Sequence, residues 1–166
     1  METEFDIIRK HTATCPVTIE GMARDLGLAV KRMRLPDSVS GKLVALASPP
    51  GFEIHVNSSH SENRIRFTIA HEIAHYVLHR DLIRNGIVDD ELYRSEQVGS
   101  RYETQANAFA ADLLMPKALV KARFEKLMSL ISDPDRILET MASDFQVSRS
   151  AMRIRLRTIV QLELPL

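Results

Sequence analysis

The clearest hydrophobic pattern in the chain runs through residues 59–79, where apolar positions recur at helical spacing. Placed at 100° steps, these positions form one apolar side, and polar residues gather on the other. The segment Ser59-His60-Ser61-Glu62 has the spacing of a capping box, so we expect the helix to begin near Ser59 or Ser61. The predicted apolar stripe consists of Ile69, Ala70, Ile73, Ala74 and Val77.

A second amphipathic helix is predicted from Glu103 to Met115. It should end at Met115 because Pro116 follows, and the residue before a proline disfavours helical geometry. Residues 81–99, between the two helices, are polar and contain glycines and several acids. A connection of this length without a periodic pattern is usually functional or mobile.

The remaining pattern predicts an α+β fold with a short antiparallel sheet. We expect a helix over 18–26, a strand over 28–30, and a hairpin with strands over 43–47 and 52–57. In strand 52–57 apolar and polar residues alternate, so one face is apolar. At a sheet edge this strand could align an extended substrate, whereas an interior strand has no free edge. Both positions are compatible with the alternation.

The C-terminal part predicts two helices, over 135–145 and 147–159, joined by a tight turn with Ser148 as N-cap. This arrangement is similar to a helix-turn-helix. Phosphate contact is one interpretation of its basic second helix, but the chain has a net charge of zero and a pI of about 7.0. Arginines on such a helix more often form a solvated face or contact a protein, so Arg149 and Arg153 are candidates for substrate docking. The basic residues of this helix are Arg149, Arg153, Arg155 and Arg157.

The segment His71-Glu72-Ile73-Ala74-His75, within the first helix, has the spacing of a zinc hydrolase motif. Four residues turn a helix through about 400°, so His71 and His75 project from nearly the same side and can share a metal. Glu72 lies beside this pair, where it can take a proton from an activated water molecule as general base. The segment predicts a divalent-metal site with a catalytic carboxylate.

His79 continues the i, i+4 series but is a poor third ligand. On a straight helix its Cα lies about 12 Å along the axis from that of His71, too far for both to hold one ion. A polar residue at the helix end, or a group that hydrogen-bonds a ligand, is the expected role.

Glu103 is the best candidate for the third protein ligand that a catalytic zinc requires. Asn107, one turn further, could accept a hydrogen bond from a ligating imidazole. The segment from Ser100 to Glu103 also has the spacing of a capping box, in which Glu103 would only cap its own helix. Spacing alone leaves the two roles of Glu103 open.

Hydroxyl and imidazole side chains near the motif are candidates for stabilising a tetrahedral oxyanion. They are Tyr93, Tyr102, His60 and His79.

Residues 64–79, Arg-Ile-Arg-Phe-Thr-Ile-Ala-His-Glu-Ile-Ala-His-Tyr-Val-Leu-His, and residues 103–116, from Glu103 to Pro116, resemble the ImmA/IrrE metallopeptidases. The resemblance extends from about residue 18 to residue 156. It implies His71, His75 and Glu103 as metal ligands and Glu72 as general base. It also implies a zincin-like fold and a helix-turn-helix repressor of a phage, mobile element or stress regulon as substrate.

Together these observations predict a metallopeptidase domain over 1–132, with a helix-turn-helix-like segment over 133–166 packed on it. The expected cofactor is Zn²⁺, with Mn²⁺ or Fe²⁺ as alternatives. The acidic N-terminus, the lack of a long apolar run and the single cysteine predict a cytoplasmic protein without membrane contact, with Cys15 as a small packing residue. The alternative function is a DNA- or protein-binding regulator with a vestigial or structural metal site; the unligated Glu72 favours catalysis.

Overall fold

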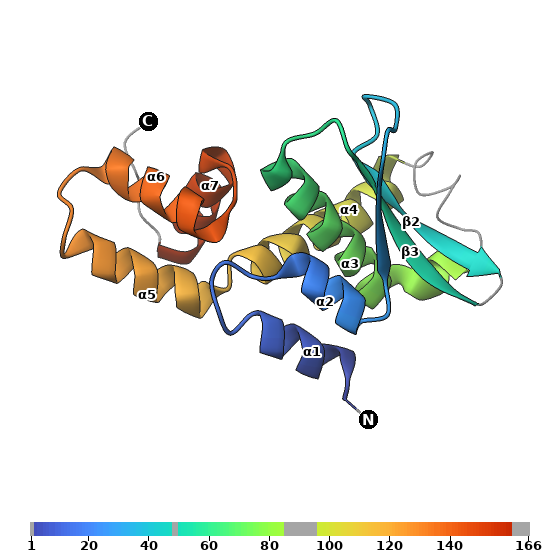
Figure 1. The fold of residues 1–166 in the computed structure, drawn as a ribbon. Coiled ribbons are helices and arrows are strands. Elements are labelled where there is room, and N and C mark those ends of the chain that lie inside the picture. Colours follow the sequence, from blue (N-terminus) through green and yellow to red (C-terminus); the bar gives the residue numbers. More distant parts are fainter. Residues whose placement is uncertain (1, 48–49, 85–95, 161–166) are drawn as a thin grey trace.

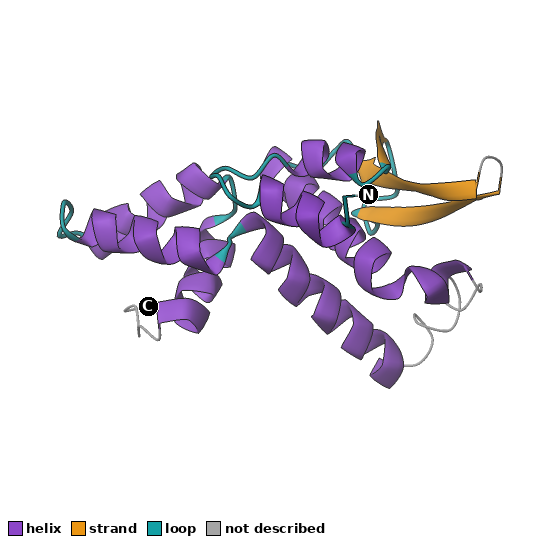
Figure 2. Ribbon diagram, turned by 90° about the horizontal axis from the view of Figure 1, so that it is seen from below, coloured by secondary structure: helices purple, strands orange, loops and turns teal. Residues whose placement is uncertain are grey.

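The computed structural model describes residues 2–47, 50–84 and 96–160 of the chain. A small sheet lies at one end of the molecule and three helices lie at the other, with the longest helices between them (Figures 1 and 2). The elements in chain order are α1 (Glu4–His11), α2 (Ile19–Asp25), β1 (Ala29–Met33), β2 (Gly41–Ala47), β3 (Pro50–Asn57), α3 (Glu62–Arg84), α4 (Glu96–Leu114), α5 (Lys117–Met128), α6 (Pro134–Phe145) and α7 (Arg149–Val160).

The sheet has the strand order β1-β3-β2. The hairpin of β2 and β3 is antiparallel, as predicted, but β1 pairs with β3 in parallel, so the sheet is mixed rather than antiparallel. The α+β class is confirmed. Strand β3 contains residues 52–57 and is the central strand, so of the two positions left open the interior one is correct and the edge is not. The open edge beside the hairpin belongs to β2.

The sheet and helices α1 to α4 form the body of the molecule. Its core lies between the sheet and α3, because alternating residues of β3 meet the apolar stripe of that helix. Helix α2 packs against both β1 and α3, and α4 packs along α3. The central side chains of this layer are fully buried, which fixes α3 rigidly beneath the sheet. They are Ile54, Val56, Ile69, Ala70 and Ile73.

Local signals explain most helix ends. Gly27, with φ of 79°, follows the end of α2 in the left-handed conformation that glycine adopts at lowest cost. Helix α3 begins directly after Ser61. Helix α4 ends at Leu114, one residue before the predicted stop, but it begins at Glu96, well before Glu103. No helix among the described residues is long and apolar enough to cross a membrane.

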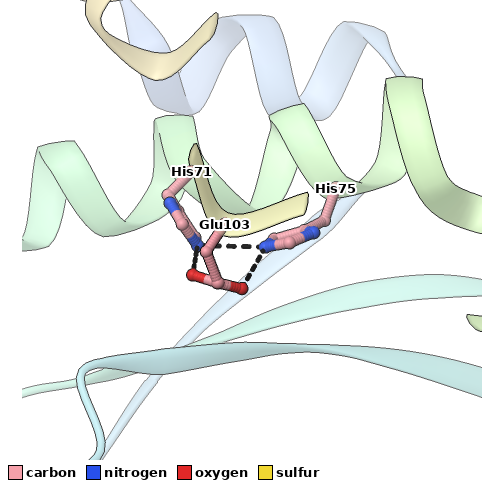
Figure 3. Close-up of side chains that lie close together, drawn as sticks. All are labelled: His71, His75 and Glu103. Atoms are coloured by element: carbon pink, nitrogen blue, oxygen red, sulfur yellow. Dashed lines mark hydrogen bonds and ion pairs between the residues drawn. The ribbon is translucent and has the colours of Figure 1, made fainter. Parts of the chain in front are cut away.

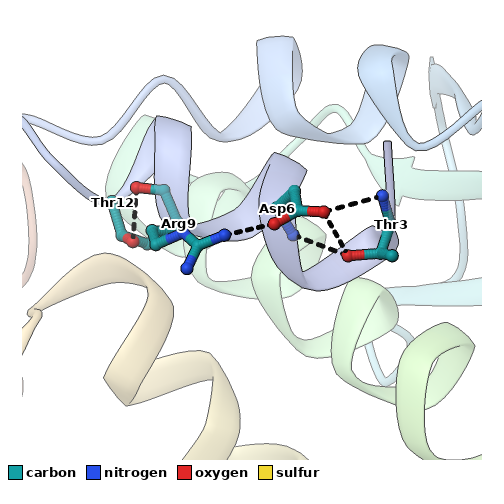
Figure 4. Close-up of polar contacts among 4 residues, drawn as sticks. All are labelled: Thr3, Asp6, Arg9 and Thr12. Carbon is teal, nitrogen blue, oxygen red and sulfur yellow. Dashed lines mark hydrogen bonds and ion pairs between the residues drawn. The ribbon is translucent and has the colours of Figure 1, made fainter. Parts of the chain in front are cut away.

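Helix α1, which the hydrophobic pattern did not predict, has a complete capping box at its N-terminus (Figure 4). Thr3 Oγ1 accepts a hydrogen bond from the backbone of Asp6 at 3.2 Å, and the Asp6 carboxylate accepts one from the backbone of Thr3 at 3.0 Å. The hydroxyl and the backbone N–H of Thr3 both donate to the Asp6 carboxylate and hold its pKa below its usual value. Arg80 of α3 pairs with Glu4 and thereby joins this helix to the body.

Helices α5, α6 and α7 pack on one another as a three-helix unit. The turn between α6 and α7 is tight because Gln146 adopts a left-handed conformation with φ of 52°. Ser148 Oγ accepts a hydrogen bond from the backbone of Ala151 at 3.1 Å, which confirms its role as N-cap of α7. Helix α5 was not predicted, and the predicted domain limit at 132/133 separates it from the two helices on which it packs.

Candidate metal centre

Two helices bring three potential ligands to one point. His71 and His75 project from α3, and Glu103 projects from α4 so that one carboxylate oxygen faces each ring (Figure 3). Glu103 Oε2 lies 3.2 Å from His71 Nε2, Glu103 Oε1 lies 3.2 Å from His75 Nε2, and the two Nε2 atoms lie 3.0 Å apart. Among the described residues this is the one group of three or more His, Cys, Asp or Glu with metal-binding geometry.

The donor set fits zinc. Nitrogen and oxygen ligands of tetrahedral zinc lie at about 2.0–2.2 Å from the ion, which separates neighbouring ligand atoms by about 3.3–3.6 Å. The observed separations are within a few tenths of an ångström of these values. The side chain of Glu103 is 45% exposed, so the centre is open to solvent on that side. Three protein ligands and an open side are typical of a catalytic rather than a structural zinc site.

Asn107 orients the first imidazole. Its Oδ1 lies 3.0 Å from His71 Nδ1, so Nδ1–H of the neutral ring donates to the amide oxygen. This hydrogen bond leaves the lone pair of Nε2 directed at the centre. The contact has the geometry predicted for Asn107 from its position one turn after Glu103.

A chain of two hydrogen bonds orients the second imidazole. His79 Nε2 lies 3.1 Å from Gln105 Oε1, and His79 Nδ1 lies 3.1 Å from His75 Nδ1. Because the Gln105 oxygen can only accept, His79 carries its proton on Nε2, and its Nδ1 accepts the Nδ1–H of His75. The lone pair of His75 Nε2 then faces the centre. His79 thus contacts the candidate ligand His75 rather than the centre itself.

Burial keeps His79 in the neutral form that this chain requires. The side chain is almost fully buried, and desolvation lowers its pKa. A protonated ring would lose the acceptor that His75 uses.

Glu103 lies well inside α4, which begins seven residues earlier at Glu96. The capping-box alternative for Glu103 is therefore wrong, because that role requires a position in the first turn. The neighbouring His71 and His75 rings hold the pKa of Glu103 well below its usual range, so it is a carboxylate at neutral pH. Burial alone would lower the pKa of His71, but the hydrogen bond to Glu103 and the charge of Glu72 raise it overall. The acidic side chains around this centre therefore stabilise a positive charge placed there.

Glu72 lies beside the centre and is buried, with a residue exposure of 7%. Burial raises its pKa, and the neighbouring His71 and His75 oppose that effect. The backbone N–H of Leu43 of β2 faces this carboxylate and also opposes the rise of its pKa. A carboxylate in this position is suited to accept a proton and then release it.

The open edge of the sheet runs past this carboxylate. The backbone N–H of Asn57 donates to the carbonyl of Ser40 at 2.9 Å, so even-numbered residues of β2 turn their N–H and C=O groups toward β3. Odd-numbered residues turn theirs outward. The outward N–H of Leu43 faces Glu72, and Ala45 and Ala47 follow along the same edge.

The other candidates are placed as follows. Tyr93 lies outside the described residues. His60 lies in the turn before α3, and the nine helical rises from Glu62 to His71 separate it from the centre by about 13.5 Å along the axis. Tyr102 stacks edge-on against His79, with ring centroids 4.9 Å apart, and so borders the hydrogen-bond chain.

Cys15 is exposed rather than a packing residue. Its thiol lies 3.2 Å from the carbonyl oxygen of Asp144, and partial burial raises its pKa. The prediction of a buried apolar role was wrong because the segment before Pro16 runs along the surface between the body and α6.

The arginines of α7 differ in their partners. Arg149 pairs with Asp135 and lies 3.4 Å from Glu139, and Arg155 pairs with Asp112 of α4 at 2.6 Å. Of the two docking candidates, Arg149 therefore forms ion pairs within the unit. Arg153 and Arg157 have no ion-pair partner among the described residues.

Two residues of the site have no signal in the sequence. Gln105 was not considered, because a glutamine on a polar helix face is common and its partner His79 lies on another helix. Leu43 contributes only its backbone, so no side-chain motif can reveal it.

Comparison with known proteins agrees with this geometry. The family model Peptidase_M78, described as the IrrE N-terminal-like domain, matches residues 23–157. The chain belongs to this family. It is 32% identical over 100 residues to the radiation response metalloprotease IrrE of Deinococcus radiodurans, a match that covers 59% of this chain and 28% of that protein. The resemblance to the ImmA/IrrE metallopeptidases is confirmed.

A solved structure of a Mycobacterium tuberculosis transcriptional regulator has the same fold as this Peptidase_M78 chain. The TM-score is 0.60 at 20% sequence identity, and the match covers 98% of this chain and 48% of that one. The chain thus spans less than half the length of either relative.

Proposed function

We propose that this chain is a zinc-dependent endopeptidase that cleaves a helix-turn-helix repressor of the XRE type and thereby relieves repression. The observation that carries the peptidase assignment is the position of the buried Glu72 carboxylate beside the open three-ligand centre of His71, His75 and Glu103. A structural site has no use for an unligated carboxylate next to the ion. Membership of a peptidase family supports the same reaction class.

The chain's own residues prepare the reaction. His71 and His75 present oriented lone pairs, and Glu103 supplies the negative charge that holds a cation. A zinc ion at this point would supply Lewis-acid chemistry, which lowers the pKa of water and polarises a carbonyl group. Glu72 accepts the proton of the attacking water and returns it to the leaving amine. Its burial excludes bulk water from this proton transfer.

The edge strand supports the choice of an extended peptide segment as substrate. Ala45 and Ala47 turn their backbone groups away from β3, next to the strand position that contacts Glu72. A substrate strand can pair with such groups and place its scissile carbonyl beside the centre. Both side chains are small and exposed, so they leave room for a partner strand.

The repressor part of the proposal comes from the family resemblance and the overall design. The three-helix unit presents Arg153 and Arg157 at α7 without ion-pair partners among the described residues, next to the exposed Ile154. Such a surface suits docking of a folded acidic or amphipathic partner. The proposed cofactor is Zn²⁺, with Mn²⁺ and Fe²⁺ compatible with the same nitrogen and oxygen ligands.

A regulator that binds DNA through α6 and α7 is the alternative. The tight turn at Gln146 and the fold shared with a transcriptional regulator favour it. Against it, Arg149 and Arg155 are neutralised by acids of this chain, which leaves few cations for phosphate contact.

The test mixes the purified protein with the helix-turn-helix repressor encoded nearest its gene, with zinc and with a chelator. We expect two fragments from one cut, formed only with zinc. An intact repressor under both conditions, together with sequence-specific DNA binding by the chain, would support the regulator instead. Mass spectrometry of the fragments identifies the cleaved bond.

A further inference from the structure

Gly41, the first residue of edge strand β2, lies in very close contact with its surroundings. A Cβ atom added there would lie 2.4 Å from Cγ2 of Thr68 and 2.6 Å from the carbonyl oxygen of His55. Neither neighbour gives way easily, because Thr68 is a buried β-branched residue of α3 and the carbonyl belongs to the adjacent strand. Glycine therefore lets β2 approach α3 more closely than any other residue could.

The contact of Gly41 with Thr68 comes directly before the contact of Leu43 with Glu72, the proposed base, along both β2 and α3. Thr68 is one helical turn before Glu72, and Gly41 is two residues before Leu43. One turn of helix rises about 5.4 Å and two strand residues about 6.6 Å, so the pairs Gly41–Thr68 and Leu43–Glu72 are successive contacts between β2 and α3. The short distance between β2 and α3 at Gly41 and Thr68 therefore sets the distance between the two elements at Leu43 and Glu72.

Leu43 reaches Glu72 with a backbone group, which has no freedom of its own. Its N–H points out of the sheet edge because the neighbouring even-numbered residues pair with β3. If β2 moved away from α3, no rotamer change of Leu43 could bring its N–H back to Glu72. The position of the whole strand therefore decides how close this N–H lies to the Glu72 carboxylate.

We infer that Gly41 is a positioning residue: by letting β2 lie against Thr68, it holds the backbone N–H of Leu43 on the Glu72 carboxylate and so fixes the direction of that carboxylate. Its catalytic meaning rests on the proposed function, in which Glu72 is the general base. A misplacement of about 1 Å can cost up to about 100-fold in rate.

The first test needs no metal and no substrate. Amide hydrogen exchange of the metal-free protein, followed residue by residue by NMR, compares Leu43 with Ala45, whose N–H also faces the open edge. We expect slow exchange at Leu43 and fast exchange at Ala45. Gly41→Ala and Glu72→Ala should each accelerate exchange at Leu43 about tenfold or more, whereas Glu72→Gln, which keeps an acceptor oxygen, should not.

Gly51 provides the matched control. It lies in the same sheet, opposite Leu46, and a Cβ added there meets nothing within 4 Å. Gly51→Ala should therefore leave exchange at Leu43 and turnover unchanged. Fast exchange at Leu43 in the wild type, or no change in Gly41→Ala, would overturn the inference.

The second test measures turnover. In Gly41→Ala we expect kcat to fall about 10- to 100-fold while KM and zinc affinity stay within about twofold of the wild type. A general loss of structure would change all three. If Gly41→Ala does not fold, replacing the Leu43 amide by an ester removes the same N–H without moving the strand, and kcat should fall to a similar extent.

The two proposals fail separately. A wild-type protein that cleaves nothing with zinc bound would refute the peptidase function, whereas the exchange pattern at Leu43 would still report the contact of β2 with Glu72. An active wild type whose kcat is unchanged in both Gly41→Ala and the Leu43 ester would refute the positioning role alone.

Discussion

Charged and polar residues are used differently at the two ends of this molecule. At the metal centre, groups from α3 and α4 converge on one point, and their hydrogen bonds form directed chains from Asn107 and Gln105 to the ligand nitrogens. In the three-helix unit, several arginines are each neutralised by a nearby acid, as in the pair of Arg123 and Asp144. Polar groups that converge on one point indicate a reaction centre, whereas arginines that each pair with one acid indicate contacts that hold helices together.

The two regions also differ in burial: α3 is held rigidly by the core, whereas α7 is exposed to solvent. The ligand helix α3 is fixed beneath the sheet by fully buried residues, so a ligand cannot move without the core. Helix α7 instead exposes Ile154, which is 66% accessible, and contacts the body through Arg155 at the end of α4. The first region suits a reaction centre, and the second suits a surface that meets a partner.

We expect the largest effect from removing the proposed general base, Glu72. Glu72→Gln preserves shape but cannot accept a proton, so kcat should fall about 10²- to 10⁴-fold. Zinc content and melting temperature should stay near those of the wild type, because Glu72 is not a ligand. Wild-type turnover on a confirmed substrate would show that another group activates the water.

The hydrogen-bond chains provide the next test. His79→Ala and Asn107→Leu each remove a group that fixes a ligand tautomer, and such changes lower metal affinity by about 10- to 100-fold. Zinc titration against a chelator of known affinity measures the loss.

His60→Ala is the matched control, because His60 lies in the turn before α3, remote from the centre. It should leave zinc affinity unchanged. Equal affinity losses in the three variants would mean that the hydrogen-bond chains do not orient the ligands.

Removing Arg155, which links α7 to the end of α4, should have a moderate effect on the free energy of unfolding. Arg155 has a nearly buried side chain that donates to the Met115 carbonyl at 2.9 Å and to Asp112. Arg155→Met should lower the free energy of unfolding by about 1–2 kcal/mol, a range kept low because Asp112 is largely exposed. Arg157→Met, on the exposed side of α7, should change it by less than about 0.5 kcal/mol. Urea unfolding followed by circular dichroism compares them.

The smallest effect concerns docking. Arg153→Glu with Arg157→Glu should lower kcat/KM for an intact repressor a few-fold at low salt, because exposed charges mainly change association rates. Cleavage of a short peptide that spans the same bond should stay unchanged. Equal losses on both substrates would assign these arginines to the structure of α7 rather than to a docking surface.

Sequence reasoning succeeded where the relevant contacts are local. The i, i+4 spacing of His71 and His75, the break at Pro116 and the cap at Ser148 each depend on neighbours within one or two turns. The alternation in β3 correctly assigned its apolar face, but alternation is the same in an edge strand and in an interior strand. Only the order of the strands, set by long-range pairing, shows that β2 is the edge.

The role of Glu103 shows the same limit. Its spacing from Ser100 fitted a cap as well as a ligand, and the choice depended on where α4 begins and how it packs on α3. Gln105, Leu43 and Gly41 were not predicted, because each acts through a residue distant in the sequence. Backbone groups and close approaches leave no residue-type pattern.

A crystal structure of the zinc-loaded protein, with anomalous scattering at the zinc edge, tests the central claim most directly. We predict one ion per chain, within about 2.0–2.2 Å of His71 Nε2, His75 Nε2 and a Glu103 carboxylate oxygen, with a fourth position on the side of Glu72 and without a protein ligand. An ion held by four protein ligands, or one bound elsewhere with this centre empty, would contradict the account.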